Sequence, residues 1–236
     1  MTKTIALMGA MDEEVGLLLG EMTNTRSRTA AGIRFTEGLF RGCPVVVCRC
    51  GVGKVNAAAA AQVLASEFRI EALVFTGVAG ALDPALEIGD IVVSSESVQH
   101  DMDASPLGFA RGIIPFQTES VFPADPDWVR LAEESCKAAG VRFATGRVLS
   151  GDRFVADREE VAKLREEFGG ACTEMEGAAV AQVCRMNGIP HVIIRSMSDK
   201  ANGAAPESFA EFTAAASARS FGIVSGMLEL RALRQP

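Results

Sequence analysis

Residues 170–198, GACTEMEGAAVAQVCRMNGIPHVIIRSMS, predict a strand, a helix and a second strand in direct succession. GACTEM is short and mostly apolar, and EGAAVAQVCRMN is rich in small helix-forming residues and is stopped by Gly188 and Pro190. HVIIRSMS is an apolar, β-branched run that is typical of a buried strand. This alternation is the pattern of an α/β fold, in which helices cover a central sheet.

The same alternation continues over most of the chain. Further strands are predicted at 4–11, 33–40, 43–50, 72–76, 89–100 and 141–150. Further helices are predicted at 54–68, 126–140, 157–169 and 208–233. Arg41-Gly42 is expected to form a hairpin turn, GVAGAL (77–82) a glycine turn, and 101–126 a long loop of the kind that is usually functional. We therefore expect one domain over 1–236, a three-layer α/β/α fold with a central mixed sheet.

Composition and charge exclude several functional classes. The net charge is −7 with no basic run, which argues against a nucleic-acid partner. No segment approaches the roughly 20 apolar residues that span a bilayer, and the N-terminus does not resemble a secretory signal. The six cysteines form no CxxC pair, which predicts buried thiols in a reducing cytoplasm. With only two histidines in addition, we expect neither a metal site nor a cofactor.

Acidic residues dominate the segments that follow the predicted strands, where ligands of α/β folds usually bind. These segments are Asp12 to Glu14, GVGKVN (51–56), GVAGAL (77–82), SGDRFV (150–155), EMEGA (174–178) and SMSDKA (196–201). The basic residues among them are Lys54, Arg153, Arg195 and Lys200. The glycines of GVGKVN could expose N–H groups to a phosphate, but the spacing fits neither a Walker loop nor GxGxxG, so a tight turn is the simpler interpretation. A site rich in carboxylates suits hydroxyl groups and protonatable bases better than phosphate.

Each acidic residue also has an ordinary structural interpretation. Glu174 and Glu176 point to one face if the segment is extended, where a carboxylate could accept two hydrogen bonds from a vicinal diol such as that of ribose. Glu176 could instead cap the following helix. Asp199 could be a solvated turn residue, and Glu14 a common helix-start acid. The residues alone leave these alternatives open.

Eight motifs in a fixed order carry a family resemblance. They are GAMDEEV (9–15), GVGKVNAA (51–58), TGVAGAL (76–82), GDIVVS (89–94), QHDMD (99–103), SGDRFV (150–155), EMEGAAVAQVC (174–184) and RSMSDKA (195–201). Together they resemble the purine nucleoside phosphorylase/uridine phosphorylase superfamily, and most of all its hydrolytic branch, the 5′-methylthioadenosine/S-adenosylhomocysteine nucleosidases. The resemblance spans nearly the whole chain.

The resemblance implies catalytic roles for three residues. Asp199, ordered by Ser198, would be the general acid that protonates N7 of adenine. Glu14 would bind the attacking water, and Arg195 would fix Glu14 or that water. A protonated Asp199 near neutral pH requires a raised pKa, which burial and nearby acids would supply.

The resemblance also implies the substrate-binding residues. Glu176 would hold the ribose hydroxyls, with Met175 packed against the sugar and Glu174 beside them. Phe154 would stack on the purine, and backbone groups of Val155 would contact its edge. The remaining pocket residues would be Met11, Val52 and Phe209, with Phe209 near the 5′-alkylthio group.

Two segments depart from the common form of this family. Val78 stands in the glycine turn where members often carry a hydroxyl residue. DMDASPLGFARGIIPF (101–116) has Ser105-Pro106 and Arg111 at unusual places, yet the resemblance implies that this loop reaches across a homodimer interface and covers the neighbouring site. The 5′ end of the pocket is therefore the part that sequence defines least.

The motifs favour hydrolysis over phosphorolysis. Phosphorylases of this superfamily place arginines after the first strand and in the glycine turn, where this chain has Met11-Asp12-Glu13-Glu14 and GVAGAL. The expected reaction is hydrolysis of a small-molecule nucleoside, methylthioadenosine or adenosylhomocysteine, to adenine, as in methionine salvage. The alternatives are a nucleosidase for a futalosine-type nucleoside, a phosphate-dependent phosphorylase, and a nucleoside-binding protein without catalysis.

Overall fold

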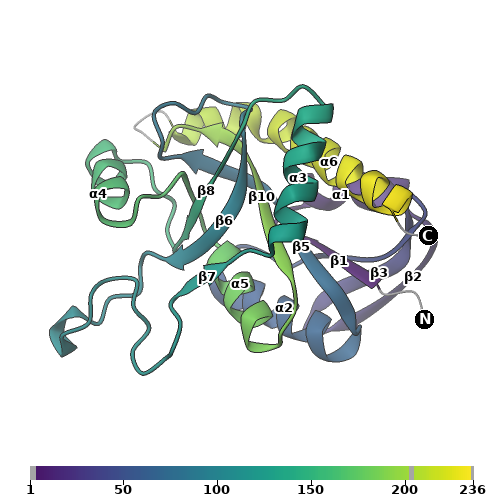
Figure 1. Cartoon of the computed structure of the whole chain (residues 1–236), viewed down its shortest axis with the longest axis horizontal. Helices are drawn as coiled ribbons and strands as arrows, with labels where there is room; N and C mark the ends of the chain where they lie inside the picture. The colour runs from purple at the N-terminus through teal and green to yellow at the C-terminus, as the bar shows by residue number, and fades with distance from the viewer. Residues whose placement is uncertain (1–3, 202–204, 235–236) are drawn as a thin grey trace.

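The computed structural model describes residues 4–201 and 205–234, which form one ten-stranded sheet flanked by six α-helices (Figure 1). The strands are β1 (Thr4–Gly9), β2 (Thr23–Ala30), β3 (Ile33–Phe40), β4 (Cys43–Arg49), β5 (Ile70–Ala81), β6 (Ile91–Gln99), β7 (Val121–Pro123), β8 (Phe143–Ser150), β9 (Cys172–Glu174) and β10 (His191–Asp199). The helices are α1 (Asp12–Glu21), α2 (Lys54–Glu67), the short 3-10 helix η1 (Ser105–Leu107), α3 (Pro126–Ala138), α4 (Arg158–Phe168), α5 (Gly177–Met186) and α6 (Ala205–Arg234).

The sheet is mixed, as predicted, and half of it closes on itself. Its order is β10-β6-β8-β9-β5-β1-β4-β3-β2, and β10 also pairs in parallel with β5. The strands β5, β10, β6, β8 and β9 therefore form a closed ring. The other half is an open extension that ends in the antiparallel strands β3 and β2. The ring brings the ends of β5, β9 and β10 close together.

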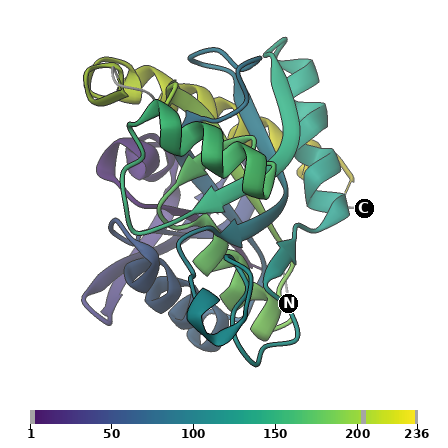
Figure 2. The ribbon, with the colours of Figure 1, turned by 90° about the vertical axis from the view of Figure 1, so that its left-hand side faces the viewer.

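Helices cover both faces of the sheet (Figures 1 and 2). The layer of α2 and α5 packs on one face through small side chains such as Ala57, Ala61 and Ala181, which let the helices approach closely. The layer of α1, α3 and α6 packs on the other face through larger side chains such as Leu18 and Met227. The three-layer α/β/α prediction is confirmed, and these two cores hold the strand ends rigidly.

The predicted glycine turn at 77–82 is wrong, because β5 continues through it to Ala81. Gly77, Val78 and Gly80 pair with β10, so the segment has partners that a turn would lack. A Cβ atom at Gly77 would collide with the side chains of Arg195 and Glu14. The glycine therefore provides space for two charged side chains to approach the backbone.

The sequence also did not predict α1 and β2 as separate elements. The strand β2, TNTRSRTA, is almost entirely exposed and has no apolar alternation. It forms the edge of the sheet, where polar and charged side chains discourage pairing with another chain. The hairpin between β3 and β4 lies where Arg41-Gly42 predicted it, with both residues at positive φ.

Candidate active site

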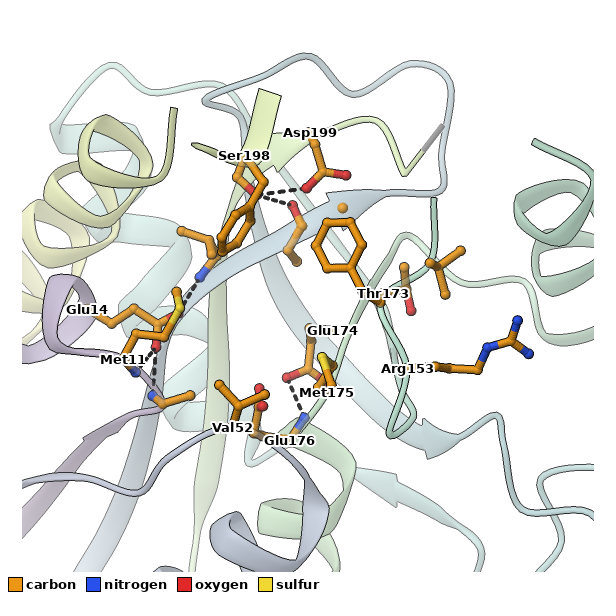
Figure 3. A pocket seen from close by; sticks show the side chains of 17 residues that line it. Met11, Glu14, Val52, Arg153, Thr173, Glu174, Met175, Glu176, Ser198 and Asp199 are labelled. Atoms are coloured by element: carbon orange, nitrogen blue, oxygen red, sulfur yellow. Dashed lines mark hydrogen bonds between the residues drawn. The ribbon is translucent and has the colours of Figure 1, made fainter. Parts of the chain in front are cut away.

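A cavity of about 290 Å³ lies at the carboxyl ends of β1, β5, β9 and β10 (Figure 3). All of the predicted site residues except Arg195 line it. They are Met11, Glu14, Val52, Val78, Phe154, Val155, Glu174, Met175, Glu176, Ser198, Asp199 and Phe209. The fold thus brings together side chains that are up to 198 positions apart, between Met11 and Phe209.

Glu14 is held from three sides. It occupies the first turn of α1, where its Oε2 accepts hydrogen bonds from the backbone N–H groups of Ala10 (2.6 Å) and Met11 (3.0 Å). Its Oε1 accepts from the N–H of Val78 on β5 (3.0 Å). Burial raises its pKa, and the Arg195 charge and these hydrogen bonds oppose that rise. Glu14 is therefore a helix-start acid that also ties α1 to β5 and faces the cavity.

Arg195 lies behind the cavity wall rather than in it. Its side chain on β10 is completely buried and forms an ion pair with Glu174 through Nη2. Glu14 and Glu176 each lie 3.7 Å from the guanidinium, and the Phe75 ring lies 4.3 Å below Cζ. One cation thus serves three carboxylates, so it can set their positions and charge without touching a ligand.

Glu174, rather than Glu176, caps helix α5. Its carboxylate accepts hydrogen bonds from the N–H groups of Glu176 (3.1 Å) and Gly177 (2.8 Å), and Ser150 Oγ accepts from Ala178 N (2.7 Å). Glu176 occupies the N-cap position of α5, but its own side chain forms no capping hydrogen bond with any described residue. Because the cap is provided by its neighbour, the carboxylate of Glu176 can face the cavity.

Glu176 is held by a backbone donor and by its charged surroundings. Its Oε1 accepts from Gly53 N (2.7 Å), at the turn before α2. Burial, with the charge of Glu174, raises the pKa of Glu176 to about 8. The group is therefore poised to exchange a proton near neutral pH.

Asp199 ends β10 and is buried, so it is not a solvated turn residue. Its Oδ2 accepts from Ser198 Oγ (2.9 Å), and its Oδ1 accepts from Ala201 N (2.7 Å). Burial raises its pKa, against the effect of these two hydrogen bonds. A Cβ at Gly80 would lie 2.8 Å from Oδ1, so glycine is needed for the carboxyl group to fit here.

The mouth of the cavity is aromatic. The rings of Phe154 and Phe209 meet edge to face, with centroids 5.6 Å apart. Phe154 and Val52 are about half exposed although both line the cavity. An apolar, partly open rim of this kind suits a flat, largely apolar ligand group.

The sequence profile of the phosphorylase superfamily matches residues 4–229. The chain belongs to this superfamily. Among relatives, a 5′-methylthioadenosine/S-adenosylhomocysteine nucleosidase of Halalkalibacterium halodurans is 40 % identical over 95 % of this chain and 96 % of its own.

Solved structures of the superfamily have the same fold. The 5′-methylthioadenosine/S-adenosylhomocysteine nucleosidase of Neisseria meningitidis, in complex with methylthio-immucillin-A, is 36 % identical with a TM-score of 0.93, and covers 97 % of this chain and 99 % of its own. Futalosine hydrolase of Helicobacter pylori is 30 % identical with a TM-score of 0.93, and covers 97 % and 98 %.

For this superfamily member, sequence reasoning missed several lining residues. They are Ala10, Ala79, Gly80, Arg153 and Thr173. Four of them are small residues within two positions of predicted ones, and Ala79 and Gly80 lie in GVAGAL, a segment that the strand-end rule had selected. Arg153 is paired with Glu160 (3.3 Å) and points away from the other labelled side chains (Figure 3).

Proposed function

We propose that this superfamily member hydrolyses the N-glycosidic bond of 5′-methylthioadenosine and S-adenosylhomocysteine, releasing adenine and the thioribose product. The observation that carries the proposal is the placement of buried carboxyl groups on two sides of one cavity. Glu14 and Glu176 lie at one side of it, and Asp199 lies at the end of β10. The names of the nucleosidase relatives at up to 40 % identity support the same substrates.

The carboxyl groups match the charges of this reaction. Cleavage leaves an electron-rich purine and an electron-poor, oxocarbenium-like ribose. Asp199, whose pKa is raised by burial, donates the proton that the departing base needs at N7. Glu176 accepts hydrogen bonds from the ribose hydroxyls, and the charge of Glu174 beside it stabilises the cationic sugar. Glu14, which Arg195 positions, holds the attacking water against the sugar.

Water rather than phosphate fits the nucleophile side. The first turn of α1 carries Asp12, Glu13 and Glu14, of which Glu14 lines the cavity, and a phosphate there would meet like charge. The N–H groups of Gly53 and Lys54, which could have cradled a phosphate, donate instead to Glu176 (2.7 Å) and Asp152 (2.8 Å). The tight-turn interpretation of GVGKVN therefore fits better than the phosphate interpretation.

One assay tests this function. Adenine release would be followed for methylthioadenosine, adenosylhomocysteine, deoxyadenosine and a futalosine-type nucleoside, each with and without phosphate. We expect release from the first two at rates that phosphate leaves unchanged. A phosphate requirement would make the protein a phosphorylase, and preference for the futalosine-type nucleoside would favour the function of the H. pylori relative. Nucleoside binding without release would indicate a binding protein.

We also propose a homodimer in which the 101–116 loop covers the neighbouring site. In Figure 1 this teal segment projects from the body of the molecule. Leu107 and Phe116 on it are 71 % and 90 % exposed, which is costly for a monomer. A single monomer mass in sedimentation equilibrium at micromolar protein would contradict this proposal. The six buried free thiols favour a cytoplasmic location. A role in methionine salvage there follows from the proposed substrate.

Glu176→Gln is expected to lower kcat/KM for methylthioadenosine by about 10- to 100-fold, because a hydrogen-bonding group left without its partner in a buried site costs roughly 1–3 kcal/mol. The amide still accepts from Gly53 N, but presents an N–H donor where the ribose hydroxyls need an acceptor. Steady-state kinetics of adenine release would measure the loss. Activity within twofold of wild type would leave Glu176 as a structural residue.

The same substitution has a pH-dependent effect on stability. Folding raises the pKa of Glu176 from 4.5 to about 8, so the folded protein binds more protons than the unfolded chain in that window. The stability that protonated Glu176 provides is present below pH 4.5 and is lost as the pH rises through about 8. Gln does not titrate. We therefore expect the Tm of Glu176→Gln to gain on that of wild type as the pH rises from 4.5 to about 8, with no further gain above that pH.

A further inference from the structure

The turn before α2, GVGK, has one charged residue that the proposed reaction does not use. Lys54 is the first residue of α2, and its side chain turns toward the start of the 101–116 loop. Its Nζ lies 2.6 Å from Asp101 Oδ1 and 3.1 Å from Gln99 Oε1. The side chains of Lys54 and Asp101 are only 16 % and 21 % exposed, so solvent screens this ion pair weakly.

A third residue closes these contacts into a ring. Asp101 Oδ2 accepts from the backbone N–H of Asp152 (2.9 Å), and Asp152 Oδ1 accepts from the backbone N–H of Lys54 (2.8 Å). Burial tends to raise the pKa of Asp101, but the Lys54 ammonium and Asp152 N–H outweigh it and hold that pKa below its ordinary value. We call Lys54, Asp101 and Asp152 the clasp.

The clasp joins two segments that border the cavity to a third beside them, and all three lie outside the strands. The turn carries Val52 and Gly53, whose N–H holds Glu176 Oε1 at 2.7 Å. The segment after β8 carries Phe154 and Val155, which line the cavity. The third is the root of the 101–116 loop. Since no ladder hydrogen bonds fix such segments, side-chain contacts must set their spacing.

Close packing at the clasp leaves little freedom. Gly53 has a φ of 97°, and a Cβ there would lie 3.2 Å from Asp152 Oδ1. The turn and the segment after β8 therefore touch at Gly53 and Asp152, next in sequence to Val52 and near Phe154. A shift of one segment would move the other, and with it the donor that positions Glu176.

We propose that Lys54 and Asp101 are positioning residues for the reaction: their ion pair holds the turn before α2 and the segment after β8 at the spacing that places Glu176, Val52 and Phe154 around the nucleoside. The inference rests on the proposed function for its substrate. It predicts an effect mainly on KM, because the groups moved contact the bound nucleoside, whereas Asp199 is fixed by Ser198 and Ala201, outside the clasp.

The test compares Lys54→Met, Asp101→Asn and their double variant in adenine release from methylthioadenosine. A misplacement of about 1 Å can cost up to about 100-fold, so we expect kcat/KM to fall about 10- to 100-fold in each single variant, chiefly through KM. The double variant should lose little more than either one, because both break the same pair. Lys54→Arg keeps the charge and should retain most of the affinity.

Arg231→Met is the matched control. Arg231 and Glu71 form an ion pair of similar burial, 24 % and 12 % exposed, on α6 and β5 away from the cavity. This variant should lower the Tm without changing KM. Clasp variants that lower the Tm like the control but leave KM within twofold of wild type would overturn the inference. Additive losses of kcat/KM in the double variant would overturn it too. So would a Lys54→Arg variant whose KM is as high as that of Lys54→Met.

A second readout separates the inference from the proposed function. The Kd of adenine, measured by calorimetry, should weaken in the two single variants, by a smaller factor than KM because adenine contacts Phe154 but lacks the ribose that Glu176 binds. A wild-type protein that binds adenine but releases none from any nucleoside would refute the proposed function, while the adenine Kd would still test the clasp. An adenine Kd that the clasp variants leave unchanged would overturn the clasp.

Discussion

Asp199→Asn is expected to abolish most adenine release while leaving the fold intact. General-acid help is typically worth about 10²–10⁴-fold, and an amide has no proton to give to N7. The amide keeps the shape of the carboxyl group, its oxygen can still accept from Ala201 N, and the hydroxyl of Ser198 can turn to accept from its NH₂ group. We therefore expect kcat to fall by about 10²-fold or more, with an unchanged urea midpoint.

The pH profile adds an independent check on Asp199. Burial raises its pKa, and only the protonated form can donate, so wild-type kcat should decline as the pH rises through that pKa. The Asn variant should lack this decline. Asp157→Asn is the control, because Asp157 caps α4 by accepting from Glu159 N and Glu160 N, which an amide oxygen can also do. An Asp199→Asn variant with a kcat within threefold of this control would contradict the general-acid role.

The sequence predicted which segments meet, because that follows from a simple rule. Strands and helices alternate, so the ends of the parallel strands gather at one edge, and Glu14 and Asp199, which lie in segments that follow predicted strands, could be assigned to one cavity by this rule. The hairpin turn at Arg41-Gly42 was predictable for a similar reason, since turn chemistry is local.

The roles inside that cavity depend on contacts between distant residues, which local sequence does not encode. Glu174 and Glu176 are equally acidic and two positions apart, yet Glu174 caps α5 while Glu176 accepts from Gly53. The glycines at the end of β5 led to the prediction of a turn, because glycine is typical of turns. Their actual reason is the space that Arg195 and Glu14 require beside Gly77, which only the packed fold reveals.

Arg195→Met should cost the most stability of any substitution at the site. It removes the buried cation that contacts Glu174 and lies 3.7 Å from both Glu14 and Glu176. Loss of one partner from a buried ion pair typically costs about 3–5 kcal/mol, because the remaining charge has neither water nor a counter-ion. The carboxyl groups would respond by taking up protons, and a neutral Glu14 would hold the attacking water less firmly. Adenine release should therefore fall together with the free energy of unfolding.

The double variant Arg195→Met/Glu174→Gln distinguishes a general loss of packing from this electrostatic cause. The Glu174→Gln change keeps a cap oxygen for Gly177 N and removes one buried charge, so the double variant should recover a measurable part of the lost unfolding free energy. In urea unfolding and adenine-release assays we expect stability to recover without recovery of activity. Activity stays low because Glu14 still lacks the Arg195 charge that positions it. If the double variant were less stable than Arg195→Met by the full cost of a second substitution, Arg195 would matter for its volume and its contact with Phe75 rather than for its charge.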